Sequence, residues 1–255
     1  MKESTKKNWD DFWDQKSDTK EVYANTDRIR RNLARNMDLP GKRILEVGAG
    51  TGRDSFYMSQ DGATLVLLDY SMNSLKIIRN NLPSTENIGA VGGDAFALPF
   101  PDNSFDAVFH QGLLEHFREQ DAENLLKENI RVLKPGGLLV VDVPQRWHIY
   151  TVIKHVLIAL NSWFAGWERE FSVRELRALL KELGMNPVDA YGEWMYPSLF
   201  YRTFREAFYK IGVKLPLYPR LVPPVSRIRE KIRHGMDGSA VKLNTALSIG
   251  VIAKK

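Results

Sequence analysis

One ten-residue segment constrains the fold of this chain more than any other. Residues 43–52 read RILEVGAGTG, in which two apolar residues lead into Glu46 and glycines follow at positions 48, 50 and 52. Glycine has no Cβ, so backbone in such a loop can approach a ligand closely. A helix that starts behind the loop presents unpaired N–H groups to it. The segment therefore predicts a strand, a ligand-binding loop and a helix, which open a doubly wound α/β sheet.

The glycine spacing separates this loop from the dinucleotide-binding fingerprint G-x-G-x-x-G. Here the third glycine, Gly52, comes two residues after Gly50, and Arg53 occupies the fingerprint position. The next apolar run, 64–68, ends at Asp69. An acid at the end of the second strand can bind two ribose hydroxyls. Nicotinamide enzymes use the same arrangement, so Asp69 alone does not separate the two kinds of cofactor.

Four motifs follow one another along residues 43–143. They are E-x-G-x-G-x-G from Glu46, L-D-x-S from Leu68, G-D-A-x-x-L-P-F from Gly93 and L-K-P-G-G from Leu133. Because these four motifs occur in this order, the chain resembles the class I S-adenosylmethionine-dependent methyltransferases of the small-molecule type. The resemblance implies a Rossmann-like sheet of seven strands with the last antiparallel, helical inserts that form a cap, and S-adenosylmethionine as the cofactor.

The same resemblance implies roles for individual residues. Glu46 would bind the methionine amino group, Asp69 the ribose, and Asp94 with the Ala95 amide the adenine edge. Tyr70 would lie along the adenine, while His110 and Gln111 would neighbour the methionine part. The complete set of expected cofactor-binding residues is Glu46, Gly48, Ala49, Gly50, Gly52, Asp69, Tyr70, Asp94, Ala95, His110 and Gln111.

The pair Glu115-His116 follows the fourth expected strand. A histidine near the transferred methyl could act as general base, because its pKa lies near neutrality. We therefore name His116 as the candidate catalytic residue for an oxygen acceptor, with His110 or Tyr23 behind it. The alternative is that both side chains brace the next helix. The pattern G-x-x-E-H-F also resembles fatty-acid cyclopropane synthases, but those enzymes use a Cys that this chain lacks.

The apolar pattern predicts one methyltransferase domain over residues 1–255. We expect strands near 43–47, 64–69, 87–91, 105–109, 137–143, 187–191 and 246–252. Residues 1–37 would form a helical lid over the cofactor, with Trp9, Phe12 and Trp13 as its aromatic cluster. Two inserts, 144–171 and 193–243, would roof the acceptor site. Packing of the lid cluster against the edge of the sheet is the alternative for that segment.

Both inserts carry unusual side-chain patterns. Apolar residues recur at helical spacing from Ile149 to Trp167, which is typical of one face of an amphipathic helix. The simplest interpretation is that this face is buried in the fold. Residues 200–235 hold nine Lys or Arg against two Glu, a surplus of +7 in a chain whose net charge is +5. Together the inserts could form an apolar acceptor pocket or a patch that touches an anionic membrane; nucleic-acid binding is a minor option.

Composition excludes several classes of chemistry. There is no Cys, and the five His show no metal-ligand spacing, so we expect no disulfide and a metal-independent reaction. No apolar leader opens the sequence and the longest apolar run is too short to span a bilayer, so a cytoplasmic location is expected.

The sequence thus predicts a methyltransferase that moves a methyl group to an O, N or C atom of a small molecule. The acceptor could be lipid-like or glycan-linked. A nicotinamide-dependent oxidoreductase and a non-catalytic, cofactor-binding partner subunit remain as alternatives.

Overall fold

The computed structural model describes residues 5–14, 27–81, 87–163, 165–219 and 221–255. Its centre is a seven-stranded sheet in the order β3-β2-β1-β4-β5-β7-β6. The strands, as the structure has them, are β1 (Arg43–Val47), β2 (Thr64–Asp69), β3 (Ile88–Gly92), β4 (Phe105–Gln111), β5 (Leu133–Pro144), β6 (Asn186–Glu193) and β7 (Ser248–Lys254).

All neighbouring strands pair in parallel except β7, which is antiparallel to both β5 and β6. The predicted doubly wound Rossmann-like sheet with an antiparallel last strand is therefore confirmed. The order reverses beside β1, where chain crossovers leave in opposite directions. Ligands of such sheets bind at the carboxyl ends of the strands near this point.

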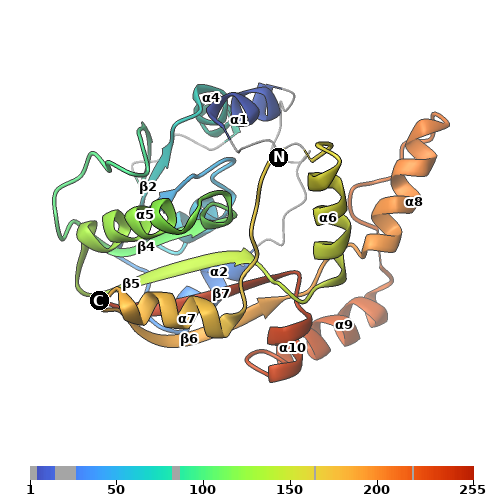
Figure 1. The fold of residues 1–255 in the computed structure, drawn as a ribbon. Helices are drawn as coiled ribbons and strands as arrows, with labels where there is room; N and C mark the ends of the chain where they lie inside the picture. The colour runs from blue at the N-terminus through green and yellow to red at the C-terminus, as the bar shows by residue number, and fades with distance from the viewer. Residues whose placement is uncertain (1–4, 15–26, 82–86, 164, 220) are drawn as a thin grey trace.

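Helices cover both faces of the sheet. They are α1 (Lys6–Asp14), α2 (Arg28–Leu33), α3 (Arg53–Gln60), α4 (Met72–Asn81), α5 (Glu119–Val132), α6 (Ile149–Ala159), α7 (Val173–Glu182), α8 (Leu199–Lys210), α9 (Pro223–Gly235) and α10 (Ala240–Thr245), with a short 3₁₀ helix, η2 (Leu114–His116). Helices α5 and α7 lie on the near face in Figure 1, where Leu125 and Leu176 join one buried cluster. Ile29, Met58 and Leu75 of α2, α3 and α4 form the second cluster on the other face.

Local signals in the sequence explain where several helices begin. Ser172 accepts a hydrogen bond from the Glu175 amide, and Glu175 accepts from the Ser172 amide, so a capping box opens α7. Residues 138–143 of β5 are completely or almost completely buried, because helices cover both faces of this strand.

The two inserts lie beyond the carboxyl end of β5 (Figure 1). The first contains α6, which is shorter than the expected apolar stripe and ends at Ala159. Its apolar face is not buried: Ile149, Val152, Val156 and the following Leu160 are exposed. The burial interpretation of this stripe is therefore wrong, because helical periodicity identifies a shared face but not whether anything covers it. No helix among the described residues is long and apolar enough to cross a membrane.

Candidate functional site

The glycine loop after β1 is held against the end of β2. Gly48, Gly50 and Gly52 all have positive φ, which side chains with a Cβ rarely adopt. The Gly50 amide donates to Asp69 Oδ2 at 2.8 Å, and the Ser71 amide donates to Asp69 Oδ1 at 2.9 Å. The carboxylate of Asp69 therefore fixes the loop and the start of the following segment at once.

A cavity of ≈350 Å³ opens above this loop. The loops that follow β1, β2, β3 and β4 all contribute to its wall, as expected at the carboxyl edge of the sheet. Most of the predicted cofactor residues line it: Glu46, Gly48, Ala49, Gly50, Asp69, Tyr70, Asp94, Ala95 and Gln111. His116, the predicted catalytic residue, lines it as well.

Two predicted residues lie outside the wall of this cavity. Gly52 caps the N-terminus of α3, and its amide donates to the Ala49 carbonyl at 2.8 Å. His110 is completely buried within β4, and neither ring nitrogen has a hydrogen-bond partner among the described residues. Successive side chains of a strand alternate between faces, so Gln111 reaches the cavity and His110 does not. In this geometry the His110 side chain therefore does not contact a ligand in the cavity.

Acidic side chains dominate the polar part of the cavity. Glu46 accepts a hydrogen bond from the Ser55 hydroxyl, and burial raises its pKa well above the ordinary range. Burial also raises the pKa of Asp69, although the hydrogen bonds that it accepts from backbone amides lower it. Asp54, which the sequence analysis did not select, has a pKa raised to about 6 by burial, and its Oδ1 has no partner among the described residues. The wall is therefore rich in hydrogen-bond acceptors that suit a cationic ligand with several donors.

The N-terminal helix α1 closes one side of the cavity. Trp13 lies so close to the loop that a Cβ on Gly50 would be 2.9 Å from its Cζ2. The Trp9 ring meets the His116 ring edge to face, with centroids 4.9 Å apart. The Ser71 hydroxyl donates to Asp10 at 2.6 Å and so connects α1 to the segment after β2. Helix α1 of the predicted lid therefore lines the cavity, while Tyr23 lies outside the described residues.

A second cavity of ≈340 Å³ adjoins the first. The two share Trp9, Gln111, Gly112 and His116 in their walls. His116 is almost completely buried, and burial is the main cause that lowers its pKa. Its Nδ1 has no hydrogen-bond partner among the described residues. At neutral pH the ring is therefore neutral and can accept a proton at the junction of the two cavities.

The far wall of the second cavity comes from the inserts and is charged. Lys154 of α6 donates to Glu168 Oε2 at 2.6 Å and lies 2.7 Å from Glu170 Oε1. The Trp163 indole donates to Glu168 Oε1 at 2.7 Å. Burial raises the pKa of Glu115 well above its ordinary range, and its Oε2 has no partner among the described residues. Glu115 is thus a buried carboxyl group whose charged form is disfavoured by burial.

A buried network connects the two cavities with the sheet. Arg28 of α2 donates to both oxygens of Asp142 at 2.8 Å, and the Tyr191 hydroxyl donates to Asp142 Oδ2 at 2.9 Å. The Gln111 amide, in the orientation that satisfies its neighbours, donates to Asp54 Oδ2 at 3.1 Å and accepts from Arg28 at 3.2 Å. A charge-assisted, two-pronged pair of this kind is strong and geometrically specific.

The sequence analysis missed Asp54, Arg28, Asp142, Lys154 and Glu168. Asp54 follows the glycine loop within one helical turn, so its position alone could have drawn attention to it. The other four meet only through the fold, since Arg28 and Asp142 are 114 residues apart. No local pattern marks such a pair.

Comparisons with known proteins bear on this geometry. A family model described as a methyltransferase domain matches residues 45–141, from β1 to β5. Residues 45–141 therefore form a methyltransferase domain of the class I S-adenosylmethionine-dependent type. This domain implies S-adenosylmethionine as the methyl donor, as the resemblance had predicted.

Three similar proteins illustrate the match. A demethylmenaquinone methyltransferase of Renibacterium salmoninarum is 45% identical over 103 residues, which cover 40% of this chain and 41% of that protein. The enzyme of the same name from Paenarthrobacter aurescens is 34% identical over 168 residues, 65% of this chain and 59% of the relative. The chain therefore spans about half the length of these relatives. A solved structure of a putative sarcosine dimethylglycine methyltransferase from Galdieria sulphuraria has a TM-score of 0.62 at 19% identity, over 89% of this chain and 83% of the other, and supports the fold.

Proposed function

We propose that the protein transfers the methyl group of S-adenosylmethionine to an O, N or C atom of a small molecule held in the second cavity. The observation that carries this proposal is the junction of the two cavities at His116 and Gln111. A donor in the first cavity and an acceptor in the second would meet there. Proximity and orientation of this kind can contribute about 7–11 kcal/mol to a reaction.

The first cavity suits S-adenosylmethionine by its chemistry. The cofactor carries an ammonium group, a sulfonium and two ribose hydroxyls, which match the buried carboxylates of Glu46, Asp54 and Asp69. We assign Asp69 to the ribose, Glu46 to the amino group, and Asp94 with Ala95 to the adenine edge. Tyr70 and Phe96, which also line the cavity, would flank the base.

When bound, S-adenosylmethionine supplies a methyl group already activated on a positively charged sulfur. The protein then has to orient the acceptor, exclude water and accept a proton where the acceptor loses one. Helix α1 excludes water on the side of Trp9 and Trp13, and a dry site favours the loss of charge in the reaction. Neutral His116, whose Nδ1 makes no hydrogen bond among the described residues and lies 3.8 Å from Glu168 Oε1, would take the proton of a hydroxyl acceptor.

The same roles define the domain organisation that we propose. Residues 1–255 form one methyltransferase domain, with 1–37 as its lid and the inserts 144–171 and 193–243 as its cap. In support, Lys6 and Trp9 of the lid line the first cavity, and Tyr150 and Arg202 of the inserts line the second.

The wall of the second cavity bears on the class of acceptor. The family match ends at residue 141, whereas most of the second cavity is built from Asp142 onward. The names of the relatives make a quinone-derived ring the first acceptor to test. The buried polar groups of Glu115, Lys154 and Glu168 favour an acceptor that offers polar groups to the inner wall, such as a reduced quinone with its hydroxyls.

The test is a transfer assay with S-adenosylmethionine labelled on the methyl group. Purified protein is offered demethylmenaquinol, simpler hydroquinones, and a set of small amines and phenols. Label in the organic product would support the proposal, and His116→Gln should lower that transfer without loss of cofactor binding. Cofactor binding without transfer to any acceptor would favour a non-catalytic partner subunit.

A nicotinamide-dependent oxidoreductase is the weaker alternative. A nicotinamide dinucleotide carries a diphosphate, which the carboxylates of Glu46, Asp54 and Asp69 would repel. The third glycine of the diphosphate-binding fingerprint is also replaced by Arg53.

A further inference from the structure

The second insert leaves two helices almost uncovered. Helices α8 and α9 contain no buried residue, and they lie at the side of the molecule away from α5 and α7 (Figure 1). We call residues 196–219 and 221–235 the α8–α9 surface. Four of its hydrogen bonds and ring contacts hold it together: Tyr201 and Arg205 donate to the loop after α8, Tyr196 donates to the Pro219 carbonyl, and Arg229 lies over the Tyr196 ring.

Each of the two helices exposes an apolar stripe. On α8, Phe200, Phe204 and Phe208 follow at four-residue spacing and their rings contact in sequence. Phe200 is 82% exposed, and Ile211, which continues the stripe, is 71% exposed. Solvent-exposed aromatic rings in a row cost free energy in water, so they indicate a surface that is covered in another setting.

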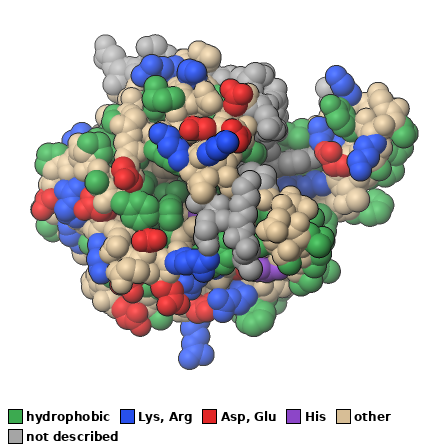
Figure 2. Space-filling model, turned by 45° about the horizontal axis from the view of Figure 1, so that its top comes forward, with side chains coloured by type: hydrophobic (Ala, Val, Ile, Leu, Met, Phe, Trp, Pro, Cys, Tyr) green, Lys and Arg blue, Asp and Glu red, His purple; other side chains and the backbone are tan. Residues whose placement is uncertain are grey.

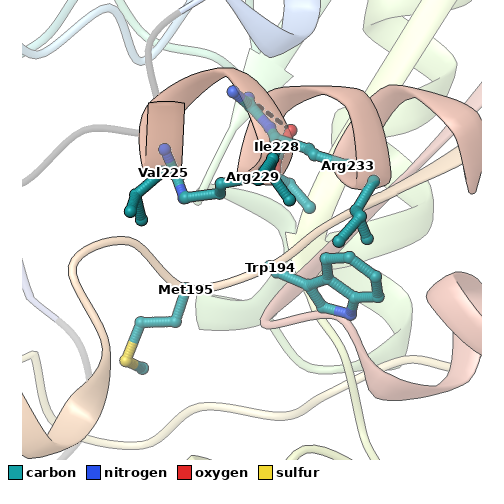
Figure 3. A pocket seen from close by; sticks show the side chains of 8 residues that line it. Trp194, Met195, Val225, Ile228, Arg229 and Arg233 are labelled. Carbon is teal, nitrogen blue, oxygen red and sulfur yellow. Dashed lines mark hydrogen bonds and ion pairs between the residues drawn. The ribbon is translucent and has the colours of Figure 1, made fainter. Parts of the chain in front are cut away.

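On α9, Val225, Ile228 and Ile232 form the second stripe. They face Trp194 and Met195 across an open groove of ≈350 Å³ (Figure 3). Arg233, which also lines the groove, pairs with the buried Glu193. Ile228 nevertheless remains 61% exposed.

Basic side chains flank these stripes. Lys210, Lys214, Arg227 and Lys231 are exposed, and within the described part of the chain they form no hydrogen bond or ion pair. The two acids of the surface are both engaged, Glu206 by Arg205 and Glu230 by the Ser226 hydroxyl. Figure 2 shows α8 as a projecting lobe on which green apolar and blue basic side chains alternate.

We propose that the α8–α9 surface docks reversibly on an anionic lipid bilayer. Apolar stripes bordered by Lys and Arg are the pattern of helices that lie in a membrane interface. Unpaired cations are attracted by acidic headgroups. A second copy of the chain fits less well, because a two-fold interface would bring one strongly basic surface against another.

Docking would also orient the acceptor cavity. Tyr150 and Lys154 of α6 and Arg202 of α8 line that cavity, while neighbouring residues of the same helices are exposed and apolar. The docking itself does not depend on the proposed function, since it needs neither cofactor nor acceptor.

The test is flotation of the purified protein with vesicles of phosphatidylcholine alone or mixed with phosphatidylglycerol. We expect flotation only with the mixed vesicles, weakened by salt. The variant Lys210→Glu, Lys214→Glu, Arg227→Glu, Lys231→Glu should bind at least about 100-fold more weakly. The variant Phe200→Ser, Ile228→Ser should also lose binding, which charge attraction alone would not require.

A matched control carries the same change of net charge elsewhere. Lys76→Glu, Arg79→Glu, Arg174→Glu, Arg177→Glu alters exposed residues of α4 and α7 and should float like the unchanged protein. All variants are first shown to keep the circular dichroism and melting temperature of the parent. Absence of flotation of the parent with acidic vesicles at low salt would overturn the proposal. An equal loss of flotation in the control variant would also overturn it. So would a parent protein that does not bind vesicles and forms a dimer that the substitutions Phe200→Ser and Ile228→Ser abolish.

Discussion

At the scale of single residues, Asp69 has both structural partners and a proposed ligand. It accepts hydrogen bonds from the amides of Gly50 and Ser71, and it also lines the cavity. The sequence predicted this residue because an acid at the end of the second strand of a βαβ unit has a defined position. It could not predict that the same carboxylate also holds the glycine loop, since that contact depends on the folded loop.

Asp69→Asn tests the ribose assignment. The amide keeps the volume of the side chain but replaces one acceptor by a donor, so affinity for S-adenosylhomocysteine should fall about 10- to 100-fold. The measurement is a calorimetric titration, with Asp102→Asn at the opposite edge of the sheet as control. An unchanged dissociation constant in Asp69→Asn would remove the residue from the ribose site.

His116→Gln tests the proposed base. If His116 accepts a proton from the acceptor, kcat should fall about 10²- to 10⁴-fold while the affinity for S-adenosylhomocysteine stays the same. Burial lowers the pKa of His116, so the acidic decline of the parent rate should be centred below the ordinary histidine value of 6.5. The acidic decline should be absent from the residual rate of the variant. A full rate in His116→Gln would leave the side chain with a bracing role.

At the scale of elements, the sequence predicted most strands to within a few residues. Local rules suffice there, because apolar runs, glycine loops and capping side chains act over a few positions. They do not suffice for the contact between β5, β6 and α2. Tyr191 reaches Asp142 across β7, and 49 residues separate them in the chain.

Gly250→Ala tests that packing. A Cβ at Gly250 would lie 2.1 Å from Cζ of the Tyr191 ring, so the ring or the strand must shift. We expect a loss of about 1–3 kcal/mol in the free energy of unfolding, measured by urea denaturation. Gly89→Ala in β3, where no atom lies within 4 Å of the added carbon, serves as control. Equal stabilities of the two variants would contradict the described packing of Tyr191.

At the scale of the whole molecule, stability and pH are linked through buried groups. Burial lowers the pKa of His110 to about 3, below its ordinary value near 6.5. The unfolded chain then binds more protons between these two values, so the contribution of His110 to stability is present above pH 6.5 and is lost as the pH falls toward 3. Buried Glu46 and Glu115 act in the opposite direction, because burial raises their pKa.

His110→Leu isolates this contribution. The stability of the parent relative to the variant should fall by about 2–3 kcal/mol between pH 7 and pH 4.5, from roughly two pH units of linkage. Urea denaturation of both proteins at each pH gives the difference, and the carboxylate contributions cancel in it. A difference that does not change with pH would mean that His110 titrates normally in the folded protein.

The central claim for the whole molecule is that the carboxylate-lined cavity at the switch point of the sheet binds S-adenosylmethionine. The most direct measurement is a calorimetric titration of the purified protein with S-adenosylhomocysteine, beside NADH and NADPH. We predict micromolar binding of S-adenosylhomocysteine and no heat from either nicotinamide dinucleotide. Binding of NADH or NADPH in its place, or of none of the three, would contradict the account.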